Sequence, residues 1–338
     1  MAGIVEALSG AGHDVTVLSP DQFPALARPK SLRHFVGTGP RLGKVRTGAH
    51  MSAAIGELAP DVVMASFSYM AHYLPQHLPM VVDFPNIEGQ RSRAIAHDAK
   101  GYHRWSAQVE ATKASFWEPR VARRALACLA CTETDLRTIQ AQGANALFVP
   151  HGSGTSEPLP PSGTSINVVL LASGGYSPND KAGRWLIETV WPRVLEQRSD
   201  LQLLVVGRGT EQVYRGMSRP GIQVLGEVSS IEEVLSKAAV VVAPVTFGAG
   251  AQLKVVTTLA LGRTMVVTPY SLQSVPEEVR SCVSVATEPR DFAHSILACI
   301  EDTTGRASRE ESLAARDWSW SSACSPLLEF LESLSAGR

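Results

Sequence analysis

The sequence has little of what marks small secreted, membrane-spanning or nucleic-acid-binding proteins. Its five cysteines are scattered over 338 residues, unlike the dense framework of a disulfide-stabilised domain. The formal net charge of −1 gives no global attraction to nucleic acid or to an anionic membrane. No apolar run approaches the ~18 residues that span a bilayer, and no signal-type segment opens the sequence. We expect a soluble, cytoplasmic protein without a nucleic-acid partner, whose membrane contact, if any, is peripheral.

One pair of cysteines is close enough to suggest a metal or redox site. Cys128 and Cys131 lie in an apolar run typical of a buried strand, where alternation places them on opposite faces. No second cysteine pair completes a zinc site. We therefore expect buried thiols and no metal.

The length is about twice that of a typical domain, which favours two domains. Apolar runs alternate with helical patterns, as in parallel α/β proteins. In the first half, strands are expected at residues 15–18, 62–65, 80–83, 126–131 and 146–149. Residues 152–165 are rich in Gly, Ser and Pro and are interpreted as a linker. The predicted domains are therefore residues 1–151 and 166–320, followed by a C-terminal helix at 321–338 that we expect to pack on the first domain.

A second α/β series follows the linker. Strands are expected at residues 166–172, 201–206, 223–225, 240–243 and 265–268, with helices at 182–197, 231–237 and 253–261. This pattern predicts two Rossmann-like domains, and ligands of such folds bind at the carboxyl ends of the strands.

The segment 91–124 is locally basic. It carries eight Lys or Arg against three acids, with Tyr102, Trp105 and Trp117 among them. One interpretation is a solvated helix face over buried aromatics. The other is a surface that attracts an anionic acceptor or a lipid headgroup.

A glycine-rich loop at residues 244–252 precedes the predicted helix 253–261. Such a loop leaves backbone N–H groups unpaired at the positive end of a helix, which suits a phosphate. The amides near Gly248, Gly250 and Ala251 would meet the phosphate, with Lys254 as a cationic clamp on the first turn.

The order of these pieces resembles the retaining glycosyltransferases of family four, which have the GT-B fold of two Rossmann-like domains facing a cleft. The most specific stretch, residues 166–268, holds a Ser-Pro-Asn loop, a Gly-Arg-Gly loop, a Val-Leu-Gly-Glu-Val segment and a Gly-x-Gly loop with its lysine. The resemblance implies a nucleoside diphosphate sugar as co-substrate and no further cofactor. It places Gly226, Glu227 and Val228 against the base, and Gly248, Gly250, Ala251 and Lys254 at the diphosphate, with Arg208 and Lys181 as secondary phosphate candidates.

This sequence departs from the family at the ribose and phosphates. Many members carry two glutamates, where Ala249 and Thr257 stand here. The Thr257 hydroxyl replaces a carboxylate that would accept from both ribose hydroxyls. Gln252 stands where many relatives have Arg.

The first half departs as well. The family's acceptor loop matches residues 83–88, where Asp83, Asn86 and Glu88 remain as catalytic candidates and Pro85 occupies the usual His position. Asn86 also suits a plain helix cap, and His151 stands in the family's hinge. The family's first strand and its loop have no counterpart. Because that strand is central in a doubly wound sheet, its loss would leave the backbone edges of its neighbours unpaired. We therefore expect either that the true start lies upstream or that this half is built unusually.

Two main functions follow. The first is a hexosyltransferase that moves a sugar from a nucleoside diphosphate sugar to an acceptor hydroxyl with retention, the acceptor being unidentified. The alternative is a degenerate glycosyltransferase that binds or regulates a partner. An epimerase would need clustered acid and base carboxylates, which the sequence does not show.

Overall fold

The computed structural model describes residues 2–19, 48–75, 77–154, 157–217 and 220–336. They fall into two compact units. The first unit comprises Met1–Pro150, Ala249–Ala251 and Ala323–Arg338, and the second comprises His151–Gly248 and Gln252–Ser322. Each is an α/β unit built on a parallel sheet.

The first unit has a four-stranded sheet in the order β1-β2-β3-β4. Its strands are β1 (Val63–Ser66), β2 (Met80–Phe84), β3 (Ala127–Ala130) and β4 (Ala146–Phe148). Its helices are α1 (Ala2–Gly10), α3 (Gly48–Leu58), the 3₁₀ helix η3 (Met70–Tyr73), α4 (Glu88–Asp98), α5 (Gly101–Arg124), α6 (Glu133–Ala141) and α16 (Ser325–Ala336). The inner strands are buried on both sides, as continuous apolar runs in parallel sheets require.

The strand expected at residues 15–18 does not form. Residues 13–19 have no regular secondary structure, and Val17 is 50% exposed. A strand needs a hydrogen-bonding neighbour, and β1 is the edge of the described sheet with no strand beside it on that side. This segment therefore has no neighbouring strand among the described residues, although Leu18 packs against the core.

The second unit has a six-stranded sheet in the order β10-β9-β8-β5-β6-β7. The strands are β5 (Asn167–Leu171), β6 (Gln202–Val206), β7 (Ile222–Gly226), β8 (Ala238–Ala243), β9 (Met265–Val267) and β10 (Val283–Val285). This is the Rossmann order, in which the chain reverses direction across the sheet between the first strand and the fourth. Here the reversal lies between β5 and β8, which pair directly.

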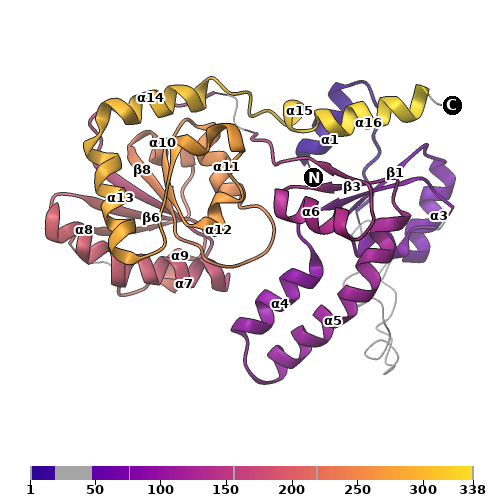
Figure 1. Cartoon of the computed structure of the whole chain (residues 1–338), viewed down its shortest axis with the longest axis horizontal. Coiled ribbons are helices and arrows are strands. Elements are labelled where there is room, and N and C mark those ends of the chain that lie inside the picture. The colour runs from indigo at the N-terminus through magenta and orange to yellow at the C-terminus, as the bar shows by residue number, and fades with distance from the viewer. Residues whose placement is uncertain (1, 20–47, 76, 155–156, 218–219, 337–338) are drawn as a thin grey trace. The chain divides into compact units, whose positions relative to one another are not determined.

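Helices cover both faces of this sheet (Figure 1). They are α7 (Ser177–Trp185), the π-helical turn Leu186–Val190, α8 (Trp191–Gln197), α9 (Thr210–Val213), α10 (Ile231–Ser236), α11 (Leu253–Ala260), α12 (Pro269–Leu272), the 3₁₀ helix η5 (Glu277–Cys282), α13 (Pro289–Glu301) and α14 (Thr303–Ala314). The one-turn helix α15 (Trp320–Ala323) follows α14 in the chain and is not one of them. The helix expected at 182–197 therefore begins earlier and contains a π turn. The sequence reading missed α13 and α14, and the helical stretch expected after residue 322 is present as α16.

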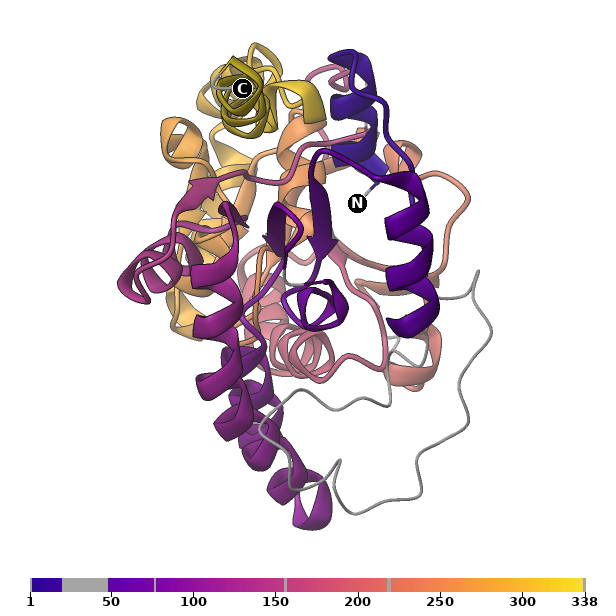
Figure 2. The same ribbon diagram turned by 90° about the vertical axis from the view of Figure 1, so that its right-hand side faces the viewer.

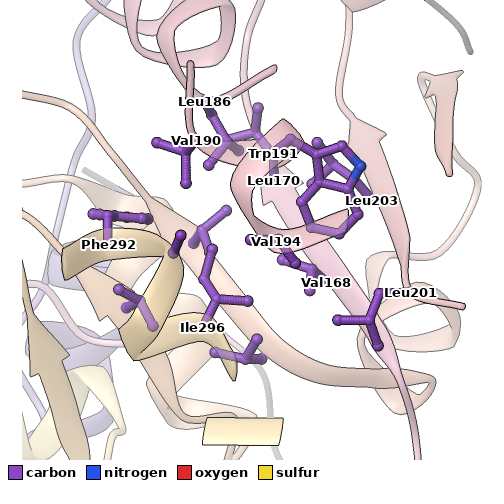
Figure 3. Close-up of a cluster of buried hydrophobic side chains, with 14 of the residues drawn as sticks. Val168, Leu170, Leu186, Val190, Trp191, Val194, Leu201, Leu203, Phe292 and Ile296 are labelled. Atoms are coloured by element: carbon purple, nitrogen blue, oxygen red, sulfur yellow. The ribbon is translucent and has the colours of Figure 1, made fainter. Parts of the chain in front are cut away.

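Alternate residues of β5 supply two separate cores. Val168 and Leu170 belong to one buried cluster, and Val169 and Leu171 to the other. Figure 3 shows the first cluster, where Trp191 lies close to the strand residues. Its indole Nε1 donates to the carbonyl of Gly221 at 3.1 Å, so this buried polar atom is satisfied. Because successive side chains of a strand point to opposite faces of the sheet, β5 packs against helices on both faces.

The segment predicted to be a linker is tied to the second unit by two buried arginines. Arg263 donates to the carbonyl of Pro160 at 2.7 Å, and Arg306 donates to Ser162 Oγ at 2.9 Å. The backbone N–H of Ser162 donates to Glu310 at 2.8 Å. Breaking this network would leave buried charges without partners, which is strongly destabilising.

Candidate donor site at the strand reversal

The loops that follow β5, β6 and β7 interlock through their backbones. The N–H of Gly174 donates to the carbonyl of Arg208 at 2.8 Å, and the N–H of Gly207 donates to the carbonyl of Gly226 at 2.7 Å. A Cβ at Gly174 would lie 2.2 Å from the Gly209 carbonyl oxygen, so a side chain there is excluded. The glycines thus permit a close approach of backbones at the carboxyl edge of the sheet.

The two helices that start at the strand reversal meet through a side-chain hydrogen bond. Asn179 lies in the first turn of α7, which follows β5, and Lys254 in the first turn of α11, which follows β8. Lys254 Nζ donates to Asn179 Oδ1 at 2.8 Å. Burial lowers the pKa of Lys254 to about 8. The site therefore holds a poorly solvated cation at the position where Rossmann folds bind phosphates.

Aromatic side chains surround the loop between β8 and α11. A Cβ at Gly248 would lie 2.7 Å from the hydroxyl of Tyr270 and 3.4 Å from that of Tyr176, and Gly248 has a φ of +155°. Lys181 Nζ lies 5.4 Å from the ring centroid of Phe247, a cation–π distance. Among the predicted residues, Lys181 thus contacts the same loop that carries Gly248, whereas Tyr176, Tyr270 and Phe247 were not singled out from the sequence.

Gln252 fixes the start of α11. Its backbone N–H donates to Ser274 Oγ at 2.7 Å, and its Nε2 donates to Ser271 Oγ at 2.8 Å. Its Oε1 is buried and has no hydrogen-bond partner among the described residues. The residue that replaces the family's arginine therefore anchors the loop. One turn further, Thr257 is partly exposed on α11.

The other predicted donor residues lie at the ends of β6 and β7. Arg208 is exposed in the Gly207–Gly209 loop, and its side chain makes no hydrogen bond or ion pair with any described residue. Gly226 is buried with φ +73°, and a Cβ there would lie 2.5 Å from Glu211 Cδ. Glu227 is exposed and Val228 partly so. Glu211 was not predicted from the sequence, because α9, the helix that carries it, is only one turn long and has no recognisable periodic pattern.

In the first unit, Asp83 lies at the carboxyl end of β2. Ser66, its register partner at the end of β1, donates from Oγ to Asp83 Oδ2 at 3.3 Å. Burial raises the pKa of Asp83 to about 6, and the Ser66 hydrogen bond opposes this shift only in part. Phe67, the residue after Ser66, has a φ of +70°, an uncommon backbone state for a bulky side chain.

Glu118 organises the start of α4. Its carboxylate accepts from the N–H groups of Glu88 and Gly89, both at 2.9 Å, and from Ser68 Oγ at 3.0 Å. Because Ile87 at the N-cap provides no side-chain bond, a carboxylate from α5 performs the capping. Asn86 does not act as the cap, and its Oδ1 is buried without a partner among the described residues. The Glu88 carboxylate lies 3.4 Å from Arg91 within the helix.

The cysteines are buried and His151 is partly buried. Burial raises the pKa of both Cys128 and Cys131 to about 12, and all five cysteines are free. Burial lowers the pKa of His151, whose ring lies edge-on to Trp320 at 5.8 Å. Within the described residues, no group of three or more His, Cys, Asp or Glu side chains has an arrangement that would hold a metal ion. No helix there combines the length and apolarity needed to cross a membrane.

Comparison with known protein families finds a match within the second unit. Residues 167–302, which contain β5 to α13, match the family of glycosyl transferases group 1. Residues 167–302 are thus similar to a glycosyltransferase domain. No curated protein matches the sequence. The strand reversal with Lys254 and Asn179 therefore lies within the matched glycosyltransferase domain.

Solved structures show that the fold is GT-B. Sucrose-phosphate synthase from Thermosynechococcus elongatus is 14% identical with a TM-score of 0.69, over 99% of this chain and 92% of its own. Anabaena HepE in complex with UDP is 15% identical with a TM-score of 0.61, over 88% and 85%. TarM is 12% identical with a TM-score of 0.64, over 85% and 58%. This chain thus spans less than two thirds of the length of TarM.

Proposed function

We propose that this protein is a nucleotide-sugar glycosyltransferase whose donor binds at the strand reversal of the second unit. The observation that carries the proposal is the meeting of Lys254 and Asn179 at 2.8 Å in the first turns of α11 and α7. Both helices direct the positive ends of their dipoles to this edge of the sheet. HepE, a protein of the same fold, has been solved with UDP and with UDP-glucose. We therefore assign a nucleoside diphosphate sugar, with UDP as the first nucleotide to test.

The chemistry that this site supports is departure of the nucleoside diphosphate. Negative charge builds on the leaving phosphate as the bond to the sugar carbon breaks. Lys254 and the amides near Gly248, Gly250 and Ala251 would stabilise that charge without a metal, and Arg208 and Lys181 are further candidates. Gly226, Glu227 and Val228 are assigned to the base, and Thr257 to the ribose.

The acceptor is assigned to the first unit around the end of β2. Asp83, with its pKa raised to about 6, and the unpartnered Asn86 Oδ1 are polar groups whose hydrogen-bonding capacity a sugar hydroxyl would satisfy. Glu88 begins α4 beside them. We propose retention at the transferred carbon from the resemblance to family four. A cytoplasmic location is proposed because all five thiols are free, as in reducing compartments.

The alternative is a binding protein without turnover, favoured by Thr257 and Ala249 in place of the family's glutamates. Calorimetry with a panel of nucleoside diphosphates, followed by hydrolysis and transfer assays with the matching sugar nucleotides, separates the two. Binding with turnover and α-configured product from an α-linked donor supports the retaining enzyme. Binding alone supports the alternative, and absence of binding to every nucleotide contradicts both.

A further inference from the structure

The α4 and α5 helices form a hairpin that projects from the sheet of the first unit (Figures 1 and 2). Its base is packed closely, since a Cβ at Gly89 would lie 3.5 Å from the Ala114 Cβ. Further along, the small side chains of Ala96 and Ala111 leave a groove of about 420 Å³ between the helices. Arg93, His97, Arg104, Gln108, Thr112 and Ser115 line it, and no lining residue is acidic.

The charge of this end of the hairpin is one-sided. The side chains of Arg93, Lys100 and Arg104 are exposed and make no hydrogen bond or ion pair with any described residue. The nearby acids are tied to other groups, Glu110 to Lys113 at 3.4 Å and Asp98 to His97 at 3.8 Å, and their side chains are only 21% and 11% exposed. The exposed charge is therefore cationic.

Exposed aromatic side chains accompany these cations. Tyr102 and Trp105, in the first turns of α5, are 63% and 48% exposed, with ring centroids 5.9 Å apart. Ile95 on α4 is 43% exposed. This corrects the reading of segment 91–124 as a solvated face over buried aromatics, which holds for Trp117 but not for these two rings.

We propose that the end of the α4–α5 hairpin is a docking surface for the anionic lipid headgroups of a bilayer. Arg93, Lys100 and Arg104 supply the complementary charge, and the groove accommodates a headgroup phosphate between the two arginines. Tyr102 and Trp105 enter the headgroup layer, where amphipathic rings are favoured. A soluble polyanion would use the cations but would gain little from a pair of exposed rings, so the aromatic pair favours the bilayer. The inference is independent of the proposed donor site.

The test is vesicle flotation of the full chain with phosphatidylcholine vesicles, either pure or with roughly one-third phosphatidylglycerol. We expect the parent protein to bind the anionic vesicles only, and to be released from them as the NaCl concentration is raised. Arg93→Glu with Arg104→Glu should lower the partition coefficient more than about twenty-fold, since each basic residue contributes roughly five-fold. The matched control is Arg215→Glu with Arg290→Glu, the same charge change at two exposed arginines of the second unit, and should retain most binding.

The aromatic pair and a soluble competitor complete the experiment. Tyr102→Ala with Trp105→Ala leaves the charge unchanged and should still weaken vesicle binding several-fold, with an unchanged melting curve. Free glycerol phosphate carries the headgroup phosphate without a bilayer. If the groove recognises that phosphate by itself, glycerol phosphate should compete weakly with vesicle binding. Equal binding to neutral and anionic vesicles would overturn the proposal, and so would equal losses in the control variant. The aromatic variant should also be compared with the parent protein on soluble heparin. If the variant binds both heparin and the anionic vesicles as tightly as the parent does, the surface binds a polyanion and the bilayer proposal is wrong.

Discussion

Lys254 donates a 2.8 Å hydrogen bond to Asn179, across the point where the strand order of the second sheet reverses. The two residues belong to different helices and are 75 positions apart in the sequence. The Asn179 oxygen is a neutral hydrogen-bond acceptor for this poorly solvated ammonium group. An incoming phosphate would offer it a charged partner in place of a neutral one, which strengthens the hydrogen bond.

The first prediction concerns protons taken up on nucleotide binding. The pKa of Lys254 is lowered to about 8 by burial, and a diphosphate beside it raises that pKa again. Between about pH 8 and 10 the complex then holds more protons than the free protein, so affinity falls as pH rises through this window. Calorimetry near pH 8.5 in buffers of different ionisation enthalpy measures this uptake directly. A Lys254→Arg variant, which stays charged, should take up no proton at that site.

The second prediction concerns the ribose. If the ribose lies where the resemblance to family four implies, Thr257→Glu places on α11 a carboxylate that accepts from both ribose hydroxyls. We expect nucleoside diphosphate affinity to rise by about 1 kcal/mol, the contribution of an added hydrogen bond. Thr257→Gln is the matched neutral control and should gain less. Titrating the 2′-deoxy nucleotide tests the mechanism, since the gain should shrink there. Loss of affinity with both nucleotides would show that the ribose lies elsewhere.

A third prediction concerns the capping of α4. Glu118→Ala removes the acceptor of two backbone N–H groups and of Ser68 Oγ. Unsatisfied buried donors cost about 1–3 kcal/mol each, so the free energy of unfolding should fall by roughly 3 kcal/mol or more. Urea denaturation measures it. The control is Glu133→Ala, which removes an exposed pair with Arg137 and should cost about 0.5 kcal/mol or less. Equal losses in the two variants would contradict the capping role.

The fourth prediction concerns Asp83, whose pKa burial raises from 3.8 to about 6. Because the unfolded chain loses this proton at lower pH than the folded chain, the neutral carboxyl stabilises the fold most below about pH 4. That contribution is lost as pH rises through about 6, and amounts to roughly 2–3 kcal/mol. Asp83→Asn should remove this slope from a plot of unfolding free energy against pH. The exposed Asp14→Asn should leave it in place, and an unchanged slope in Asp83→Asn would refute the assignment.

Much of the second unit was predictable because its signals are local. Continuous apolar runs mark β5, β6 and β8, and the glycine loops follow them directly in the sequence. Lys254 was proposed as a phosphate ligand because it lies in the first turn of the helix predicted at residues 253–261, and this remains a prediction. Its partner Asn179 is the asparagine of the Ser-Pro-Asn loop, and no local pattern indicates which neighbour its side chain will reach.

What the sequence did not reveal depends on contacts between distant residues. Glu118 read as one of three acids in a basic helix, and only the fold brings it to the N-terminus of α4. Residues 15–18 have the composition of a strand, yet a strand exists only where a neighbour supplies hydrogen bonds. Arg263 and Arg306 lie in ordinary helical and turn sequence, and their burial follows from tertiary packing.

The most direct test of the donor site is a calorimetric titration of the Lys254→Ala variant with UDP at about pH 7, where the lysine of the parent protein is mostly charged. Loss of a hydrogen bond to a charged group should weaken affinity by about 1.5–3 kcal/mol, roughly 12- to 150-fold. Lys237→Ala, at an exposed lysine of the same unit, should bind as the parent does. If the parent binds UDP and Lys254→Ala binds it equally well, the nucleotide does not occupy the strand reversal and the account is wrong.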